Sequence, residues 1–216
     1  MDSKLLRLIF PPKCTLCRKL LTAEETDLCH HCRTKGPDFL KAKRNIPFIA
    51  HWTGIWYYRD TVRQSIHRFK FGNARRYAPI YARLLAVRLQ KEGLDDFDCL
   101  SWVPIARLRR LKRGYDQSQL LAQALAEELG CSCIQVLKKV RSTPPQSSIV
   151  DAARRRANVL GAYRVIDPES VKGKRILLLD DVVTFGATAS ECAKMLMIAG
   201  AKEVNLATVA VAVHDK

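Results

Sequence analysis

The sequence predicts an α/β protein with a largely parallel sheet, helices on both faces of that sheet, and a small metal-binding module at the amino terminus. From residue 99 onward, short apolar runs alternate with segments of helical periodicity, which is typical of parallel sheets. The apolar runs are continuous, as expected for strands buried on both faces. The composition, with 48% hydrophobic and 27% charged residues in a chain of 216, is that of a globular protein and excludes wholesale disorder.

Four cysteines near the amino terminus form two short-spaced pairs, Cys14 with Cys17 and Cys29 with Cys32, separated by eleven residues. Two such pairs can place four thiolates around one ion, as in a structural zinc site. Two disulfides or four free thiols are the alternatives, and a reducing cytosol disfavours the disulfides. Residues 1–35 are too few for a core of their own, so we expect this zinc module to depend on its metal.

Residues 36–50, with three Gly or Pro residues and several cations, are expected to be a linker to a domain spanning residues 51–216. Within that domain we expect residues 51–95 to form a hood and residues 99–216 to form the core. In the hood, residues 51–58 suit a strand, apolar residues recur at helical spacing over 62–69, and residues 78–91 suit a second helix.

The remaining elements follow from periodicity and from their boundaries. Leu121, Leu125 and Leu129 form one helical stripe that Gly130 ends. Residues 141–158 lack apolar periodicity and are rich in Arg, Ser and Pro, which predicts a long loop. The other segments are predicted as strands at 100–105, 134–137, 162–166, 176–179 and 204–213, and as helices at 117–129 and 187–199.

The most informative segment follows the strand predicted at 176–179. Asp180 and Asp181 come directly after it, and a turn containing Thr184, Gly186 and Thr188 then opens a helix. Ligands of open α/β sheets bind at the carboxyl ends of strands, and backbone N–H groups at a helix start bind anions. Two carboxylates repel phosphate but suit sugar hydroxyls or the water shell of a divalent cation. The segment therefore predicts a sugar phosphate site; the alternative is a solvated acidic turn in which Thr184 caps the helix.

This segment resembles the phosphoribosyl-diphosphate (PRPP) signature of type I phosphoribosyltransferases, and the wider chain resembles the ComF family of bacterial competence proteins. The resemblance implies a phosphoribosyltransferase-like sheet with a zinc ribbon-like module, and Mg²⁺ bound together with PRPP. The matching stretches, besides the four cysteines, are Trp102-Val-Pro-Ile-Ala, Arg113-Gly-Tyr-Asp-Gln117, Arg141-Ser-Thr-Pro-Pro-Gln146, Arg156-Ala-Asn158 and Leu178 to Thr188.

The resemblance assigns roles to the residues of the signature. It implies that Asp180 and Asp181 bind the ribose hydroxyls, and that Thr184, Phe185, Gly186, Ala187 and Thr188 hold the phosphate. Phe185 departs from the family pattern, which has a second threonine there. The lost hydroxyl would weaken phosphate binding by about 1–2 kcal/mol without abolishing it, because the N–H donors remain. A Phe185 side chain that filled the hollow would remove the site.

Two basic segments could hold pyrophosphate. By resemblance, the segment that begins at Arg107 corresponds to the pyrophosphate loop, and the 141–158 segment corresponds to a mobile loop that closes over PRPP. Arg113, Arg141 and Arg156 are the preferred catalytic cations, since they lie within the family's recurring motifs. The alternative for each arginine is a solvated charge.

The net charge of +16 predicts a polyanionic partner. Residues 161–216 hold seven basic and seven acidic side chains, so the excess lies in residues 1–160. Aromatic residues interleave with arginines over residues 51–95 and could stack bases, although most of these aromatics are expected to be core.

Two classes of function remain open. The first is a PRPP-dependent transferase of unknown acceptor. The second, implied by the resemblance, is a non-catalytic protein that handles single-stranded DNA in natural transformation beside a helicase partner. No apolar stretch reaches the ~18 residues of a membrane span, and the start lacks a signal-peptide core, so a cytoplasmic protein is expected.

Overall fold

The computed structural model describes residues 11–37, 45–143 and 152–212, except for the side chains at positions 152, 153, 155 and 156. The elements in chain order are α2 (His30–Thr34), β1 (Trp52–Tyr57), α3 (Asp60–Phe71), α4 (Tyr77–Glu92), β2 (Cys99–Trp102), α5 (Arg107–Arg113), α6 (Gln117–Leu129), β3 (Leu137–Lys139), α7 (Ala152–Val159), β4 (Tyr163–Val165), β5 (Arg175–Val183), α8 (Ala187–Ile198) and β6 (Glu203–Val211).

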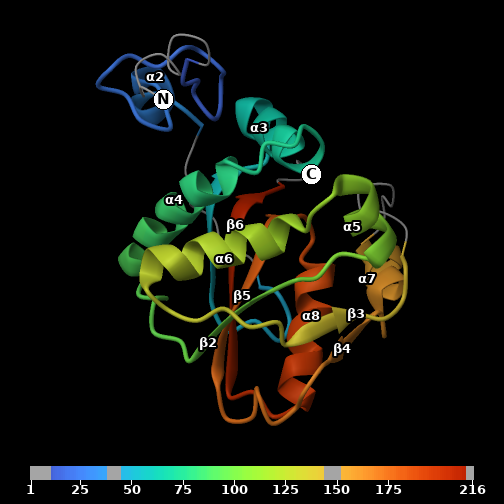
Figure 1. Ribbon diagram of the computed structural model, residues 1–216. Helices are drawn as coiled ribbons and strands as arrows, with labels where there is room; N and C mark the ends of the chain where they lie inside the picture. The colour runs from blue at the N-terminus through green and yellow to red at the C-terminus, as the bar shows by residue number, and fades with distance from the viewer. Residues whose placement is uncertain (1–10, 38–44, 144–151, 213–216) are drawn as a thin grey trace.

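Four strands form the main sheet in the order β1-β6-β5-β2, and every neighbouring pair is parallel (Figure 1). The two central strands, β5 and β6, are nine residues each and are aligned with Leu178 opposite Leu206. Their nearly continuous burial explains why they read as apolar runs without alternation. The predicted parallel sheet is confirmed.

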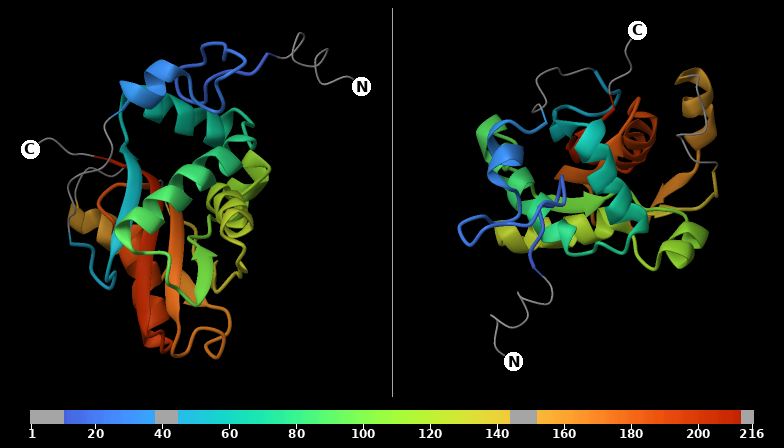
Figure 2. Two further views of the ribbon diagram at one scale, coloured as in Figure 1. Left: turned by 90° about the vertical axis from the view of Figure 1, so that its left-hand side faces the viewer. Right: turned by 90° about the horizontal axis from the view of Figure 1, so that it is seen from above.

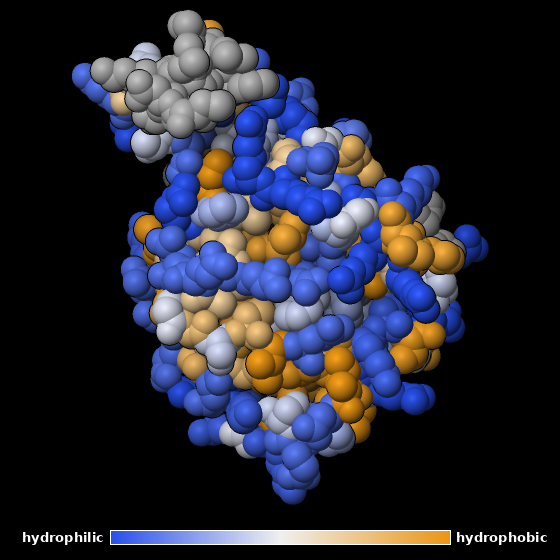
Figure 3. All heavy atoms as spheres, in the orientation of Figure 1, coloured by the Kyte–Doolittle hydropathy of each residue, from blue (hydrophilic) through white to orange (hydrophobic). Residues whose placement is uncertain are grey.

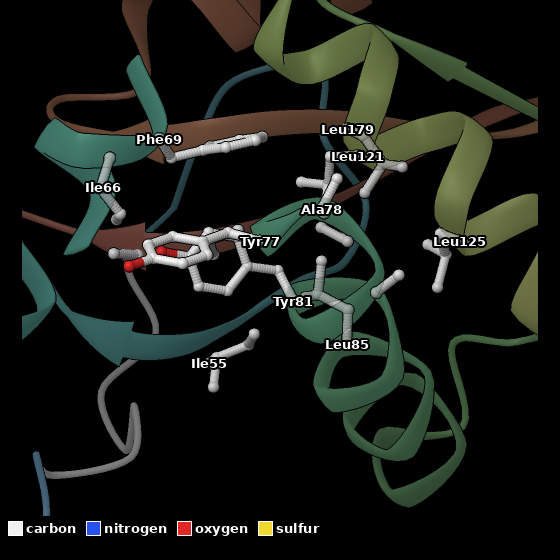
Figure 4. Close-up of a cluster of buried hydrophobic side chains, with 14 of the residues drawn as sticks. Ile55, Ile66, Phe69, Tyr77, Ala78, Tyr81, Leu85, Leu121, Leu125 and Leu179 are labelled. Carbon is white, nitrogen blue, oxygen red and sulfur yellow. The ribbon is translucent and has the colours of Figure 1, made fainter. Parts of the chain in front are cut away.

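Helices cover both faces of this sheet, as predicted. On one face, Leu177 and Leu179 pack with residues of α4 and α6, and Figure 4 shows part of this cluster. On the other face, Ile176 and Leu178 pack with residues of α8. Successive side chains of a strand point to opposite faces, so one apolar strand supplies both clusters.

The aromatic residues of the 51–95 segment belong mainly to the first cluster. Trp56, Phe69, Tyr77 and Tyr81 are at most 2% exposed, and the rings of the first three each meet Tyr81 edge to face. Figure 4 shows Phe69, Tyr77 and Tyr81 in this cluster. The interpretation of most of these aromatics as core is confirmed, whereas Phe71 is 59% exposed.

Two strands expected in the alternation lie apart from the main sheet. β3 and β4 pair only with each other, antiparallel, with Leu137 opposite Val165. Each is three residues long, with a buried first residue, an exposed second residue and a half-buried third residue. Strands covered on one side only do not need the two-faced burial of a parallel sheet.

Two segments expected as loops contain helices. α5 occupies the basic segment 107–113, and α7 occupies 152–159 within the segment expected to be one long loop. The two apolar residues of α5, Leu108 and Leu111, are 72% and 69% exposed, and hydrophobic side chains reach the surface near α5 in Figure 3. A helix without a buried apolar stripe gives no periodicity to detect, which explains the error.

The division of residues 51–216 into a hood and a core stays a prediction, with one restriction. β1 pairs with β6 inside the main sheet, so residues 52–57 are part of the sheet and not of a hood above it. The zinc module lies at one end of the molecule, next to α3 and α4 (Figure 2). Among the described residues, none of the helices has the length and apolar character needed to cross a bilayer.

Candidate functional site

A cavity of about 280 Å³ opens at the carboxyl ends of β2 and β5. This is the edge of a parallel sheet at which ligands of such folds bind. Its wall combines the end of α3, the turn after β2, the β3–β4 pair and the start of α8. The lining residues that the argument uses are Lys70, Phe71, Arg109, Arg113, Ser118, Lys139, Tyr163, Asp180, Asp181, Thr184, Gly186, Ala187 and Thr188.

The acidic pair lies inside β5, which continues to Val183, and not after the strand as the sequence suggested. Asp181 forms an ion pair with Lys70, at 2.9 Å between Nζ and Oδ2. The Oδ1 atom of Asp180 accepts hydrogen bonds from the Ser118 hydroxyl at 3.2 Å and from the Asp181 N–H at 2.9 Å. Both carboxylates line the cavity and are oriented by these partners.

The electrostatics of the pair favour a cationic or hydroxylic ligand. Burial, and next the negative charge of Asp181, raise the pKa of Asp180 to about 7, while Lys70 opposes the shift. A carboxyl group held in this way loses its proton when a cation or a hydrogen-bond donor arrives. The raised pKa of Asp180 is therefore consistent with a site for a cation or a hydrogen-bond donor.

The turn after β5 has the backbone of an anion site. Gly186 caps α8 with a φ of 78°, a left-handed conformation that glycine adopts without strain. A Cβ on Gly186 would lie 3.0 Å from the side chain of Ile46, so the turn also packs closely against the segment before β1. Thr184, Ala187 and Thr188 join Gly186 in the lining, and the N-terminus of α8 faces the cavity.

Phe185 is half-buried and is not among the cavity-lining residues. The side chain at this position therefore leaves the hollow open, and the departure from the family pattern does not block the turn.

Four cations surround the acidic pair: Lys70, Arg109, Arg113 and Lys139. Lys139 donates to the Tyr163 hydroxyl at 3.1 Å, and its pKa is lowered to about 8 by burial and next by Arg109. Arg109 donates to the carbonyl of Thr143. These side chains line the same cavity as the turn that opens α8.

Arg113 is held by two contacts at the rim. Its guanidinium lies 4.7 Å from the centre of the Phe71 ring and donates to the Gln117 side chain at 2.6 Å. Asp116, in the same motif, caps α6 through the Gln119 N–H and accepts from the Ile105 N–H at 3.0 Å. The motif that begins at Arg113 thus joins α6 to the turn after β2.

The predicted site residues separate into two groups. Asp180, Asp181, Arg113 and the turn residues other than Phe185 meet at the cavity. Arg107, Arg141 and Phe185 are not among the lining residues. Arg107 is exposed at the start of α5, and Arg141 donates to the carbonyls of Asn158 and Leu160. The side chain of Arg156 lies outside the described residues.

Sequence reasoning missed Lys70, Ser118, Lys139 and Tyr163 at the cavity. Lys70 and Ser118 sit at helix ends, and Lys139 and Tyr163 come from the separate β3–β4 pair. None of them belongs to a motif with fixed spacing, so no local signal marks them.

The four amino-terminal cysteines come together as predicted. Their sulfur atoms all lie within 4.8 Å of one another, and Cys17 Sγ and Cys29 Sγ are 3.6 Å apart. A tetrahedron of Zn–S bonds of about 2.3 Å requires sulfur separations of about 3.8 Å. The cluster thus fits a structural zinc ion. It is the one group of three or more ligand-type side chains with this geometry in the described part of the chain.

Family models match both the amino-terminal part and the carboxy-terminal part of the chain. Residues 5–43 match the family model of a double zinc ribbon domain, and residues 116–216 match that of a phosphoribosyl transferase domain. Glutamine PRPP amidotransferase from B. subtilis, a solved structure, matches 66% of this chain and 30% of its own length at 22% identity, with a TM-score of 0.46. That partial match identifies no ligand or activity for this chain.

Three curated relatives cover most of the chain. DNA utilization protein YhgH from Salmonella typhi is 31% identical over 202 residues, 89% of this chain and 87% of the relative. Competence protein F from Haemophilus influenzae is 28% identical, covering 90% and 94%. Competence protein ComFC from Streptococcus pneumoniae is 25% identical, covering 87% and 77%.

The fold, the cysteine cluster and the domain matches define a type I phosphoribosyltransferase fold joined to an N-terminal zinc ribbon. With the match to YhgH over most of both chains, the chain belongs to the ComF family, as its motifs predicted.

Proposed function

We propose that the cavity binds PRPP or a related ribose phosphate. One observation carries the proposal: the acidic pair of β5 and the turn that opens α8 line the same cavity at the carboxyl edge of the sheet. The carboxylates suit ribose hydroxyls and the turn suits the phosphate, and the two lie side by side as one sugar phosphate requires.

Each group of the cavity has a role in this proposal. The N–H groups of the turn, with the Thr184 and Thr188 hydroxyls, would hold the 5-phosphate. Asp180 and Asp181 would accept hydrogen bonds from the ribose hydroxyls. They would also hold Mg²⁺ through its waters, and the ion would neutralise part of the ligand's charge.

A transferase activity on PRPP would need little covalent chemistry from the chain. Displacement at the anomeric carbon leaves negative charge on the departing pyrophosphate, and the protein must position the reactants and stabilise that charge. Arg109, Arg113 and Lys139 lie on the cavity wall where they could do so. Arg141 and Arg156 stay predictions for this role. The acceptor of the phosphoribosyl group is not assigned.

Calorimetric titration with PRPP and Mg²⁺ tests the site. Asp181→Asn should lower the affinity at least tenfold, because it removes a carboxylate that lines the cavity and pairs with Lys70. Asp95→Asn, at an exposed aspartate before β2, is the matched control and should bind like the unmodified chain. Equal heats from Asp181→Asn and the unmodified chain would refute the site.

We propose single-stranded DNA binding as a second function. The chain carries a net charge of +16, exposed arginines at positions 59, 63, 75 and 76, and the exposed ring of Phe71. Relatives named for DNA utilization and competence add support. For this second function we also propose a helicase partner and a cytoplasmic location. The domain boundaries at residues 35 and 50 stay predictions.

Fluorescence anisotropy with a labelled oligonucleotide tests DNA binding. Phosphate contacts release counterions, so the affinity should fall by an order of magnitude or more between about 50 and 200 mM salt. An affinity that does not change with salt would contradict phosphate contacts.

A further inference from the structure

Helix α3 touches the zinc module with one part of its length. The Ser65 hydroxyl donates to the carbonyl of Thr15 at 2.7 Å, and the Arg68 guanidinium donates to the carbonyls of Thr15 and Leu16 at 3.0 and 2.7 Å. Thr15 and Leu16 are the two residues between Cys14 and Cys17, the first pair of the cysteine cluster. We call these three hydrogen bonds the α3 clamp.

The same helix reaches the cavity two residues later. Lys70 pairs with Asp181 at 2.9 Å, and Phe71 lines the cavity beneath Arg113. The side chain of Lys70 is 21% exposed and that of Asp181 is 10% exposed, so solvent screens this pair only in part. Two residues of an α-helix span about 3 Å, which leaves no flexible joint between the clamp and Lys70.

The clamp is built into the core. Leu16 and Ser65 are fully buried, and Leu16 packs in the same cluster as Ile66 and Phe69 of α3. Without a bound ion, the segment between Cys14 and Cys17 loses its metal–sulfur bonds and keeps weaker backbone hydrogen bonds, such as that from the Thr15 N–H to the Asp27 carbonyl. The donors on Ser65 and Arg68 would then lose their acceptors, and the buried face of α3 would lose its neighbour.

We propose that Lys70 is a positioning residue for the acidic pair and that the zinc site fixes Lys70 through the α3 clamp, so that zinc loading raises the affinity of the cavity for ribose phosphate. The proposal rests on the proposed function. Lys70 acts through Asp181, because the ion pair at 2.9 Å holds the carboxylate in one orientation.

Thermodynamic linkage provides the sharpest test. If zinc raises the affinity for a ligand by some factor, the ligand must raise the affinity for zinc by the same factor. Zinc affinity would be measured by competition with a chromophoric chelator, with and without saturating ribose 5-phosphate. We expect about a tenfold rise with ligand, within the usual range of such couplings. Ribose 5-phosphate affinity of the zinc-loaded and zinc-free full chain should differ by the same factor.

Variants of Lys70 separate positioning from general stability. In Lys70→Met, ribose 5-phosphate should bind more weakly and should no longer change the zinc affinity, whereas Lys70→Arg should restore the response. Lys172→Met, at an exposed lysine three residues before β5 begins, is the matched control and should behave like the unmodified chain. A Lys70→Met chain that keeps the full response would overturn the proposal.

A clamp variant covers the case in which the zinc-free chain unfolds. Arg68→Met keeps all four cysteines and the whole cavity lining, and it should weaken ribose 5-phosphate binding in the zinc-loaded chain. Arg63→Met, on the exposed side of the same helix, should not. If the unmodified chain binds neither PRPP nor ribose 5-phosphate, the proposed function fails; if it binds equally well with and without zinc and after Arg68→Met, only the coupling fails.

Discussion

At the scale of single residues, the cavity is set by how a few charges are paired and buried. Asp180 and Asp181 are neighbours in β5, yet Asp181 is held by Lys70 of α3 while Asp180 is held by Ser118 of α6. This arrangement keeps two carboxylates close together at an energetic cost, which is typical of sites that await a ligand.

Asp180→Asn should therefore stabilise the chain above neutral pH. The pKa of Asp180 is raised from its ordinary value near 3.8 to about 7, so between those values the folded state binds more protons than the unfolded state. The free energy of unfolding consequently falls as the pH rises through this range. The variant, which has no charge to bury, should melt several degrees higher at pH 8 and unchanged at pH 3.5.

Thermal melts across this pH range check the expectation, with Asp95→Asn as the control because Asp95 is exposed. A melting temperature for Asp180→Asn that follows the unmodified chain at every pH would show that Asp180 is not strained in the folded state.

At the scale of elements, the helices that face the sheet bury their apolar side chains in the core, whereas the short helix α5 leaves its apolar side chains exposed and lines the cavity with arginines. α6 buries Leu121 completely against β5 and α4, while α5 leaves Leu111 69% exposed and places Arg109 and Arg113 on the cavity wall. Because α6 also contributes Ser118 to the lining, a core helix and an exposed helix that follow one another in the chain meet at the cavity.

Leu121→Ala should cost about 2–5 kcal/mol of unfolding free energy, since it leaves a cavity in a packed core. The same change at the exposed Leu111 should cost less than about 0.5 kcal/mol. Urea denaturation of the two variants gives the comparison, and similar losses in both would contradict the burial described for α6.

At the scale of the whole molecule, the zinc module is part of the main core and not an independent appendage. Leu16, Leu28 and three of the cysteines belong to the same buried cluster as Trp56 and Tyr81. The module also contributes an ion pair between Asp27 and Arg83 of α4.

Removal of zinc should accordingly loosen the module together with α3 and leave the main sheet folded. Elemental analysis should find one zinc per chain, because the described residues hold one four-cysteine cluster. Hydrogen exchange after chelation should rise in residues 11–37 and in α3, while β5 and β6 stay protected. Uniform exchange over the whole chain, or a chain without zinc, would contradict this view.

The sequence by itself determined the features that depend on local spacing. The cysteine pairs, the two aspartates and the turn of Thr184, Gly186 and Thr188 are each fixed within a few residues, and the apolar runs of β5 and β6 predicted the parallel sheet. Such patterns are visible in the sequence because ligand geometry and strand burial constrain residues that are close together in the chain.

Only the tertiary structure decided which cations reach the cavity. Lys70, Arg109 and Lys139 line it, whereas Arg107 is exposed and Arg141 donates to main-chain carbonyls at the end of α7. All five are basic residues, so composition does not distinguish those that line the cavity from those that do not. Their positions differ because the packing of α3, α5 and the β3–β4 pair brings together residues far apart in the chain, and such contacts leave no local periodicity in the sequence.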